Sequence, residues 1–219
     1  MRQVEIYQDS DQLVSAAVNQ AVKFVQDRPL SKIALSGGTA GVKIAAGLIK
    51  ALGKENILDK AEFFMADERF VAIDDPQSNF GQIKALIGDL EPNIFMFDLP
   101  PKATIEDSVA KANQTLGQDF SFDLALMGCG PDGHTASLFP GHQYPDQTVV
   151  AETDSPKPPS MRISFGYKAF ESSNEVWFAA TGSDKATAVS QALSGNSELP
   201  VGRITGTNST KWFITEELA

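Results

Sequence analysis

The segment FDLALMGCGPDGHTASLFPGH, residues 122–142, decides the fold class of this chain. It begins with a short apolar run, residues 124–127, which is typical of a buried β-strand. The run stops abruptly in a turn that contains Gly128, Gly130 and Gly133. A buried strand that ends in glycines is characteristic of α/β sheets, in which ligands bind beyond the carboxyl ends of parallel strands. We therefore expect an α/β protein with a binding site at this turn.

His134 lies inside this glycine turn and is one of only two histidines in the chain. Histidine is the side chain that most readily gains and loses a proton near neutral pH. Its place at the end of a strand makes it a candidate general base. A histidine that is merely hydrogen-bonded within a loop is the alternative. His142 follows Gly141 in a polar stretch, and we expect no catalytic role for it.

Two other interpretations of the same segment are weaker. The letters GCGPDG match the dinucleotide-binding pattern G-x-G-x-x-G, and Glu152 stands where a ribose-binding acid would be expected. However, Pro140 and Pro145 interrupt the long helix that this pattern requires. A metal site would have to use the following residues, whose spacing fits no standard zinc pattern: Cys129, Asp132, His134 and His142.

Composition restricts the class of protein and its partners. The chain has 219 residues, 42% of them hydrophobic, and a formal net charge of −10. This charge argues against a general binder of nucleic acid or of anionic membranes. The single cysteine excludes an internal disulfide, and the first residues lack the apolar core of a signal peptide. We expect one cytoplasmic domain, residues 1–219, either a monomer or a homodimer.

Strand and helix patterns alternate along the chain. Strands are predicted at 4–7, 33–35, 62–65, 94–97, 124–127, 161–165, 175–180 and 212–214. Helices are predicted from a Ser10 cap to about 28, from 39 to about 52, from 78 or 79 to 87, at 104–116, and from a Ser183 cap onward. This alternation predicts a three-layer α/β fold with a mostly parallel, doubly wound sheet.

A second glycine turn, Ser36-Gly37-Gly38-Thr39, joins the strand at 33–35 to the next helix. Glycines allow close approach of a ligand to the backbone, and the free N–H groups of a helix start attract anions. The turn lacks the lysine of a Walker loop. It therefore indicates either a phosphate site of another kind or a tight turn without a ligand.

Charged residues stand near other predicted strand ends. Asp67, Glu68 and Arg69 follow the strand at 62–65 and are expected to point into a cleft or into solvent. Lys185 is expected in the first helical turn after Gly182, where a cation opposes the helix dipole. Such a lysine either holds an anion or is a solvated surface residue. Arg162 lies within the strand at 161–165.

These motifs together resemble the 6-phosphogluconolactonase family over essentially the whole length. The most specific segment is GPDGHTASLFPG at 130–141. Supporting segments in the family's order are LSGG at 35–38, ADERFV at 66–71, SNFG at 78–81, MRISF at 161–165, and Gly182 with Lys185. One departure is the loop SGGTAG, where the family usually has SGGSTP. The missing proline leaves the helix start less pre-organised for phosphate.

The resemblance implies the NagB/RpiA/CoA-transferase-like fold, a modified Rossmann fold shared with ribose-5-phosphate isomerase and glucosamine-6-phosphate deaminase. It implies hydrolysis of 6-phospho-D-glucono-1,5-lactone in the oxidative pentose phosphate pathway, with no cofactor and no metal. Deaminases have DEY where this chain has DER at 67–69, and GHIAFNEPG where it has GHTASLFPG at 133–141. A deaminase or isomerase, and a non-catalytic sugar-phosphate sensor, are the alternative functions.

The resemblance also suggests roles for the candidate residues. His134 would take a proton from the attacking water, and the glycine-rich turn, with Gly130 and Gly133 as substrate-binding residues, would offer backbone N–H groups to the oxyanion. Asp67 and Arg69 would hold sugar hydroxyls or the developing charge. The phosphate would be held by the following groups: Arg162, Lys185 and the backbone of Ser36, Gly37, Gly38 and Thr39. A rival mechanism makes Ser36 an acyl-forming nucleophile in the order Ser36, Asp67, His134.

Overall fold

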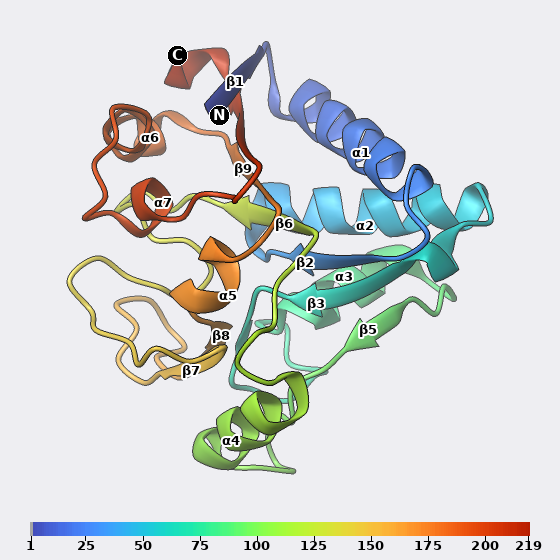
Figure 1. Cartoon of the computed structure of the whole chain (residues 1–219), viewed down its shortest axis with the longest axis vertical. Coiled ribbons are helices and arrows are strands. Elements are labelled where there is room, and N and C mark those ends of the chain that lie inside the picture. The colour runs from blue at the N-terminus through green and yellow to red at the C-terminus, as the bar shows by residue number, and fades with distance from the viewer. Residues whose placement is uncertain (1) are drawn as a thin grey trace.

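The computed structural model describes residues 2–219 of the chain. Its centre is a seven-stranded sheet in which all neighbouring strands are parallel (Figure 1). Across the sheet, the strands are β1 (Arg2–Tyr7), β10 (Ser209–Thr215), β9 (Glu175–Ala180), β6 (Leu124–Gly128), β2 (Ser31–Leu35), β3 (Ala61–Met65) and β5 (Asn93–Phe95). The predicted mostly parallel, doubly wound α/β sheet is confirmed.

The direction of winding changes between β2 and β6. From β2 the chain proceeds outward through β3 to β5, whereas from β6 it proceeds the other way through β9 to β10. The connections that leave these two strands therefore diverge to opposite sides and open a crevice at their carboxyl ends. Such a switch point is where doubly wound sheets bind ligands. Both glycine turns identified in the sequence start here.

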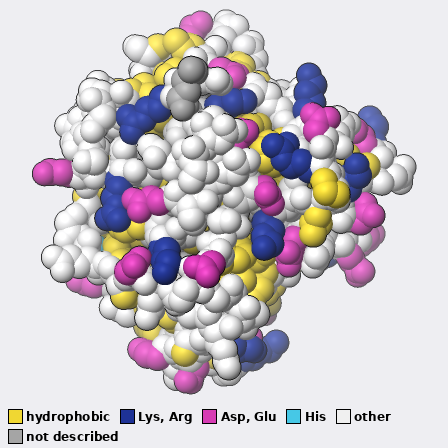
Figure 2. All heavy atoms as spheres, viewed as in Figure 1, with side chains coloured by type: hydrophobic (Ala, Val, Ile, Leu, Met, Phe, Trp, Pro, Cys, Tyr) yellow, Lys and Arg dark blue, Asp and Glu magenta, His cyan; other side chains and the backbone are white. Residues whose placement is uncertain are grey.

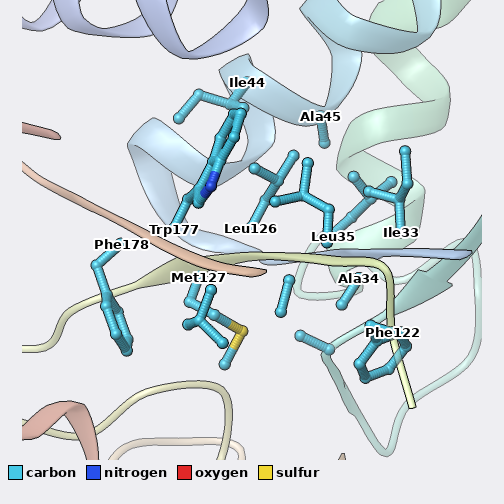
Figure 3. Close-up of a cluster of buried hydrophobic side chains, with 14 of the residues drawn as sticks. Ile33, Ala34, Leu35, Ile44, Ala45, Phe122, Leu126, Met127, Trp177 and Phe178 are labelled. Atoms are coloured by element: carbon cyan, nitrogen blue, oxygen red, sulfur yellow. The ribbon is translucent and has the colours of Figure 1, made fainter. Parts of the chain in front are cut away.

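Three helices cover one face of the sheet: α1 (Ser10–Gln26), α2 (Gly38–Lys54) and α3 (Asn79–Ile87). Successive residues of a strand point to opposite faces, and Figure 3 shows this directly. Leu35, Leu126 and Trp177 point toward α2, while Met127 and Phe178 lie on the other side. Each of these side chains is almost fully buried, which stabilises the fold by about 1.5–3 kcal/mol per large apolar residue.

The opposite face carries a second sheet that the sequence patterns did not reveal. It is antiparallel and consists of β4 (Asp67–Arg69), β8 (Arg162–Phe165) and β7 (Val149–Glu152). Helices α4 (Ile105–Leu116) and α5 (Tyr167–Glu171) pack beside it. Phe165 of β8 packs against Phe122, which precedes β6, and against Phe64 of β3, with ring centroids 4.8 and 6.1 Å away. These aromatic contacts fix the small sheet against the large one.

The remaining short elements are η1 (Leu58–Lys60), η2 (Ser183–Lys185), α6 (Ala186–Leu193), α7 (Pro200–Arg203) and η3 (Glu216–Leu218). Three sequence-based details need correction. Asp9, not Ser10, caps α1 by accepting from the Gln12 amide, since the aspartate carboxylate reaches this amide. Ser183 caps no helix in the described chain, because a 3₁₀ turn intervenes and α6 starts only at Ala186. The strand expected at 94–97 is β5, which ends at Phe95.

Charges of both signs are interspersed on the face shown in Figure 2, with no large area of a single sign. Within residues 2–219, none of the helices has the length and apolar character needed to cross a membrane.

Candidate active site

A cleft of about 360 Å³ opens at the carboxyl ends of β2, β3, β6 and β9. Ten of the eleven residues proposed from the sequence line it: Ser36, Gly37, Gly38, Thr39, Asp67, Arg69, Gly130, His134, Arg162 and Lys185. Gly133 is the exception within the described chain, and it has a packing role instead. Its φ of +82° favours glycine, and a Cβ there would lie 3.0 Å from Leu199. The cleft thus gathers residues that are up to 149 positions apart in the sequence.

The amino terminus of α2 faces this cleft through Gly38, Thr39 and Ala40. Helices α1, α3 and α4 each have a side-chain cap, from Asp9, Ser78 and Thr104 respectively. By contrast, no side chain among residues 2–219 caps α2. Its first backbone N–H groups have no partner in their own helix, and the helix dipole adds positive potential. The arrangement is suited to an anion such as a phosphate group.

His134 projects into the cleft from the turn after β6, with its side chain 16% exposed. Its Nδ1 atom is hydrogen-bonded to the Asp132 carboxylate. Burial alone would raise the pKa of Asp132, but the hydrogen bonds and charge of His134 outweigh it and lower the pKa to about 2. Asp132 is therefore ionised throughout the neutral range. When Nδ1 donates to this carboxylate, Nε2 is left as the proton acceptor of the imidazole.

The turn after β6 uses its own backbone amides. Gly130 N donates to the His134 carbonyl at 2.8 Å, and Gly133 N donates to the Gly130 carbonyl at 3.0 Å. Thr135 N and Leu138 N bond reciprocally to the carbonyls of Leu138 and Thr135. These amides hold the turn closed and are not free to donate to a substrate oxygen. The expectation that Gly130 and Gly133 supply oxyanion-stabilising amides is therefore wrong.

Asp67 reaches the floor of the cleft from the first position of β4 and is 4% exposed. It accepts a hydrogen bond from Ser137 Oγ at 2.6 Å and a longer one from Asn79 Nδ2 at 3.4 Å. Both partners are buried, so the carboxylate has a fixed orientation. Asp67 thus connects β4 with the histidine turn and with the start of α3.

Glu68 has a different position from the one that its sequence context suggested. It is fully buried beneath α3 rather than in the cleft or in solvent. Its carboxylate accepts from the amides of Arg69, Asn79 and Phe80 at 2.6–2.8 Å, and from Ser78 Oγ at 3.2 Å. Burial raises the pKa of this carboxyl despite the three backbone donors. Glu68 therefore anchors α3, which in turn places Asn79 in the cleft.

Arg69 and Arg162 face each other as direct partners in the antiparallel pairing of β4 with β8. Arg69 Nη1 donates to the Asn79 side chain and to the Gln77 carbonyl, while its buried Nε has no partner within residues 2–219. Two adjacent guanidinium groups repel each other unless negative charge lies near. Asp67 supplies part of that charge, and the free donors favour an anionic ligand.

Arg162 is more buried than expected for a simple phosphate ligand. Its Nε donates to the Pro159 carbonyl at 3.1 Å and its Nη2 to the Lys157 carbonyl at 2.9 Å. Burial lowers the pKa of this guanidinium, against the opposing effect of Asp67. The proline-rich loop at 153–160 is thus held by an arginine that also lines the cleft. Only Nη1 has no hydrogen-bond partner in the described structure.

Lys185 lies across the cleft at the end of η2, with its side chain 23% exposed. Its ammonium group is 2.9 Å from the Asp184 carboxylate and lowers the pKa of that acid. Asp184 is itself solvent-exposed, so this pair is weakly held. The lysine can therefore exchange its partner for a bound anion without a large penalty.

The alternative sites proposed for these residues are not formed. Ser36 Oγ donates to the Leu126 carbonyl at 2.9 Å, and Asp67 bonds Ser137 and Asn79, so the described chain has no Ser36–His134–Asp67 relay. Glu152 bonds Tyr144 and His142 instead of being open to a ribose. Among residues 2–219, no group of three or more His, Cys, Asp or Glu side chains is arranged to hold a metal ion.

Three residues near the cleft were not identified as site residues from the sequence. Asp132 was considered only as a metal ligand, although its spacing of two from His134 within a glycine turn could have suggested the pairing. Asn79 was visible only as part of the SNFG motif. Ser137 gave no local signal, because its partner Asp67 is 70 residues away. Contacts of this range are set by the fold.

Comparison with solved structures defines the fold class. A 6-phosphogluconolactonase from Thermotoga maritima superposes with a TM-score of 0.84 at 25% identity, covering 99% of this chain and 100% of that one. A monomeric glucosamine-6-phosphate deaminase of the NagB superfamily superposes with a TM-score of 0.81 at 20% identity, covering 99% and 98%. The latter identity supports the fold alone. The chain is an α/β protein with the NagB-like fold.

Sequence comparison then gives the family. The model for glucosamine-6-phosphate isomerases/6-phosphogluconolactonase matches residues 8–212. The 6-phosphogluconolactonase of Mycobacterium tuberculosis is 34% identical over 239 residues, covering 99% of this chain and 96% of that protein. The enzyme of the same name from Streptomyces coelicolor is 31% identical over 243 residues, covering 99% and 93%. The chain belongs to this family.

Proposed function

We propose that the protein is a 6-phosphogluconolactonase, which hydrolyses 6-phospho-D-glucono-1,5-lactone to 6-phospho-D-gluconate. The observation that carries this proposal is the cleft, in which one Asp132-paired histidine faces three cationic side chains and the uncapped start of α2. The curated relatives at 31–34% identity bear the same name. A phosphorylated cyclic ester needs the two functions that this cleft combines: anion binding and proton transfer.

His134 carries the proton transfers in this mechanism. Its Nε2 takes a proton from a water molecule as the water oxygen attacks C1 of the lactone. The bond between C1 and the ring oxygen then breaks, and the imidazolium returns the proton to that oxygen, giving the open-chain acid. Asp132 holds the imidazole through Nδ1 and stabilises the transient positive charge. The atoms of one water molecule are thereby added across the ester bond.

The phosphate group lies at the start of α2 in this proposal. The first amides of the helix, after Ser36 and Gly37, donate to it, and Lys185 turns from Asp184 to contact it. Arg162 contributes charge and its one free nitrogen. Binding energy from this remote group holds C1 against the attacking water, which reduces the entropic barrier of the reaction.

The negative charge that develops on the C1 oxygen needs a donor other than the amides of Gly130, Gly133 and Thr135, which bond within the turn after β6. Arg69 is the best candidate, because Asn79 fixes one end of its guanidinium while other donors remain unpaired. Asp67, held by Ser137, orients sugar hydroxyls. Preorganised donors of this kind stabilise a transition state because they need no rearrangement during the reaction.

The test is hydrolysis of freshly prepared 6-phosphogluconolactone, followed as acid release after subtraction of the spontaneous rate. We expect a large enzymatic excess on this substrate and only weak activity on gluconolactone, which lacks the phosphate. Release of ammonia from glucosamine 6-phosphate, without lactone hydrolysis, would instead establish a deaminase. Binding of sugar phosphates with neither activity would establish a sensor.

We further propose that the reaction proceeds without a metal or cofactor, since His134 itself can activate water. Prolonged dialysis against EDTA should leave kcat unchanged, and a loss that Zn²⁺ or Mg²⁺ restores would contradict this. With the lactone as substrate, the enzyme would act in the oxidative pentose phosphate pathway in the cytoplasm. Fractionation of the producing cells, with activity followed in each fraction, tests that location.

A further inference from the structure

A second group of polar residues lies behind the turn that carries His134. Glu152, the last residue of β7, is 4% exposed yet charged. Its carboxylate accepts from Tyr144 Oη at 2.6 Å, from His142 Nδ1 at 2.8 Å and from the Asp154 amide at 2.7 Å. His142, which the sequence placed in a polar stretch after Gly141, is therefore held by a buried carboxylate. We call Glu152, Tyr144 and His142 the rear network.

Burial and hydrogen bonding act on Glu152 in opposite directions. Burial alone would raise the pKa of its carboxyl, but the bonds from Tyr144, Asp154 and His142 outweigh burial and keep the pKa below its ordinary value. A buried, ionised carboxylate that accepts several hydrogen bonds is rigid, because any movement leaves a buried charge without partners. Glu152 is thus a fixed point in the structure.

Tyr144 transmits this rigidity to the histidine turn. Its single hydroxyl hydrogen is donated to Glu152, which leaves the oxygen to accept from the Phe139 amide at 3.0 Å. The ring of Phe139 then lies between the two imidazoles, with centroids 4.7 Å from His134 and 5.8 Å from His142. The Phe139 ring can support His134 only while its backbone is held in this place.

The same short segment also meets Asp67. Ser137, two residues before Phe139, donates to the Asp67 carboxylate at 2.6 Å, and its carbonyl is 3.2 Å from Tyr144 Oη. Ala136, immediately before Ser137, has a left-handed backbone with a φ of +49°, an uncommon conformation for a residue with a side chain. This strained turn persists only if its surroundings fix it on both sides. Asp67 holds this turn on the side of the cleft, and the rear network holds it on the opposite side.

We propose that Tyr144 and Glu152 are positioning residues that hold the 137–139 segment, and through Phe139 the imidazole of His134, in the geometry for proton transfer. This inference rests on the proposed function of His134 and deepens it. The rear network touches neither the start of α2 nor Lys185. Glu152 is the register partner of Arg162, and its charge acts on that guanidinium, so the cleaner probe of the network is Tyr144. Loss of the Tyr144 hydroxyl should reduce turnover and leave phosphate binding by α2 and Lys185 intact.

Tyr144→Phe tests the proposal, because it removes one oxygen atom and keeps the ring. We expect kcat to fall about tenfold to a hundredfold, as a small misplacement of a reacting group produces. KM should stay within about twofold, and the ionisation that controls kcat/KM should persist with a lower plateau. Tyr167→Phe is the matched control, since the Tyr167 ring packs on Tyr144 but its hydroxyl has no hydrogen bond within residues 2–219.

Several results would overturn the proposal: unchanged kcat in Tyr144→Phe, an equal loss in Tyr167→Phe, or a rise in KM alone. A merely structural role would lower the melting temperature and the binding stoichiometry of 6-phosphogluconate, measured by calorimetry, in proportion to activity. Glu152→Gln is a second variant. The NH₂ group of its side chain is a donor and cannot accept the hydrogen bond from the Asp154 amide. It should reproduce the loss of kcat at full binding stoichiometry.

A readout without catalysis separates this proposal from the proposed function. The imidazole resonances of His134, identified by their loss in His134→Gln, should shift in Tyr144→Phe and stay in place in Tyr167→Phe. If the wild-type chain does not hydrolyse the lactone but these resonances shift, the proposed function is wrong and the positioning stands. If the lactone is hydrolysed but neither the resonances nor kcat change, the positioning is wrong and the function stands.

Discussion

Two glycine-rich turns leave the neighbouring parallel strands β2 and β6, and their backbones are used in opposite ways. After β2, the chain enters α2 at once, and the first amides of the helix remain open toward the cleft. After β6, the chain folds back on itself, and the amides of Gly130, Gly133 and Thr135 all bond within the turn. The first turn offers its backbone, whereas the second offers a side chain, His134.

The glycines of the two turns are needed for different reasons. Gly38 has a φ of +75° at the start of α2, with no atom near the position of a Cβ. A Cβ on Gly130, by contrast, would overlap His134 Nδ1 and lie 2.7 Å from Asp132 Oδ1. Gly38 thus shapes the backbone of the first turn for an anion, whereas Gly130 makes room for the imidazole in the second. Neighbouring turns of similar composition can therefore divide binding from catalysis.

The largest expected effect concerns the histidine turn. His134→Gln keeps a hydrogen-bonding side chain but cannot take up the proton, so kcat should fall about 10²–10⁴-fold. Binding of 6-phosphogluconate, measured by calorimetry, should persist because the phosphate contacts belong to the other turn. A variant that keeps more than about a tenth of wild-type kcat would remove the general-base role.

Gly130→Ala tests whether room for the imidazole is what this glycine provides. Its Cβ would push His134 away from Asp132, and we expect a loss of kcat of about a hundredfold with a modest change in KM. Gly128→Ala is the matched control in the same turn, because a Cβ there meets nothing within 4 Å. Steady-state kinetics of both variants give the comparison. Equal losses would mean that the turn tolerates no side chain for reasons unrelated to His134.

Lys185→Ala addresses the binding side of the cleft. Loss of a charge-assisted hydrogen bond to phosphate should raise KM for the phosphorylated lactone about tenfold to a hundredfold. The weak activity on gluconolactone should hardly change, since this substrate has no phosphate. Lys111→Ala is the control. Lys111 lies on α4 and forms an exposed ion pair with Asp98, so this variant removes the same charge far from the proposed phosphate site. A similar loss on both lactones would show that Lys185 acts in structure or chemistry.

The smallest effect is one of stability and concerns only the second turn, which contains the ionic pair of Asp132 and His134. The pKa of Asp132 is lowered from 3.8 to about 2 by this pairing. Stability from a depressed carboxyl pKa is complete above pH 3.8 and is lost as the pH falls through about 2. Asp132→Asn should therefore flatten the loss of unfolding free energy between pH 5 and pH 2.5, measured in urea. Parallel curves for wild type and variant would contradict the pairing.

Much of this architecture was predictable because its signals are local. The apolar run at Leu124 and the glycines that follow it indicate a buried strand and a turn, whatever the rest of the chain does. The same holds for the strand and turn around Ser36. Parallel strands end at one edge of their sheet, so residues that follow different strands could be expected near one another. His134, Lys185 and Ser36 do line a common cleft. The common location of these residues followed from the geometry of a parallel sheet and not from any single segment.

The second sheet and the partners of its residues could not be predicted in this way. Strand β4 has only three residues, all charged, and it is stabilised by pairing with β8 more than 90 positions later. Glu68 looked like a surface residue because its partners on α3 are invisible from a local pattern. Arg162 looked like a free phosphate ligand because its bonds to the 153–160 loop depend on tertiary structure. Buried charge is specified by distant partners, and a single sequence does not display them.

Cys129, between Gly128 and Gly130, gives the histidine turn a built-in chemical reporter. The thiol is buried, and burial raises its pKa to about 12. Because only a thiolate attacks disulfide reagents at an appreciable rate, the closed turn is almost inert toward them. Labelling of Cys129 in native protein should therefore occur during brief local openings of this turn, and its rate is a direct measure of how often the segment that carries His134 comes apart.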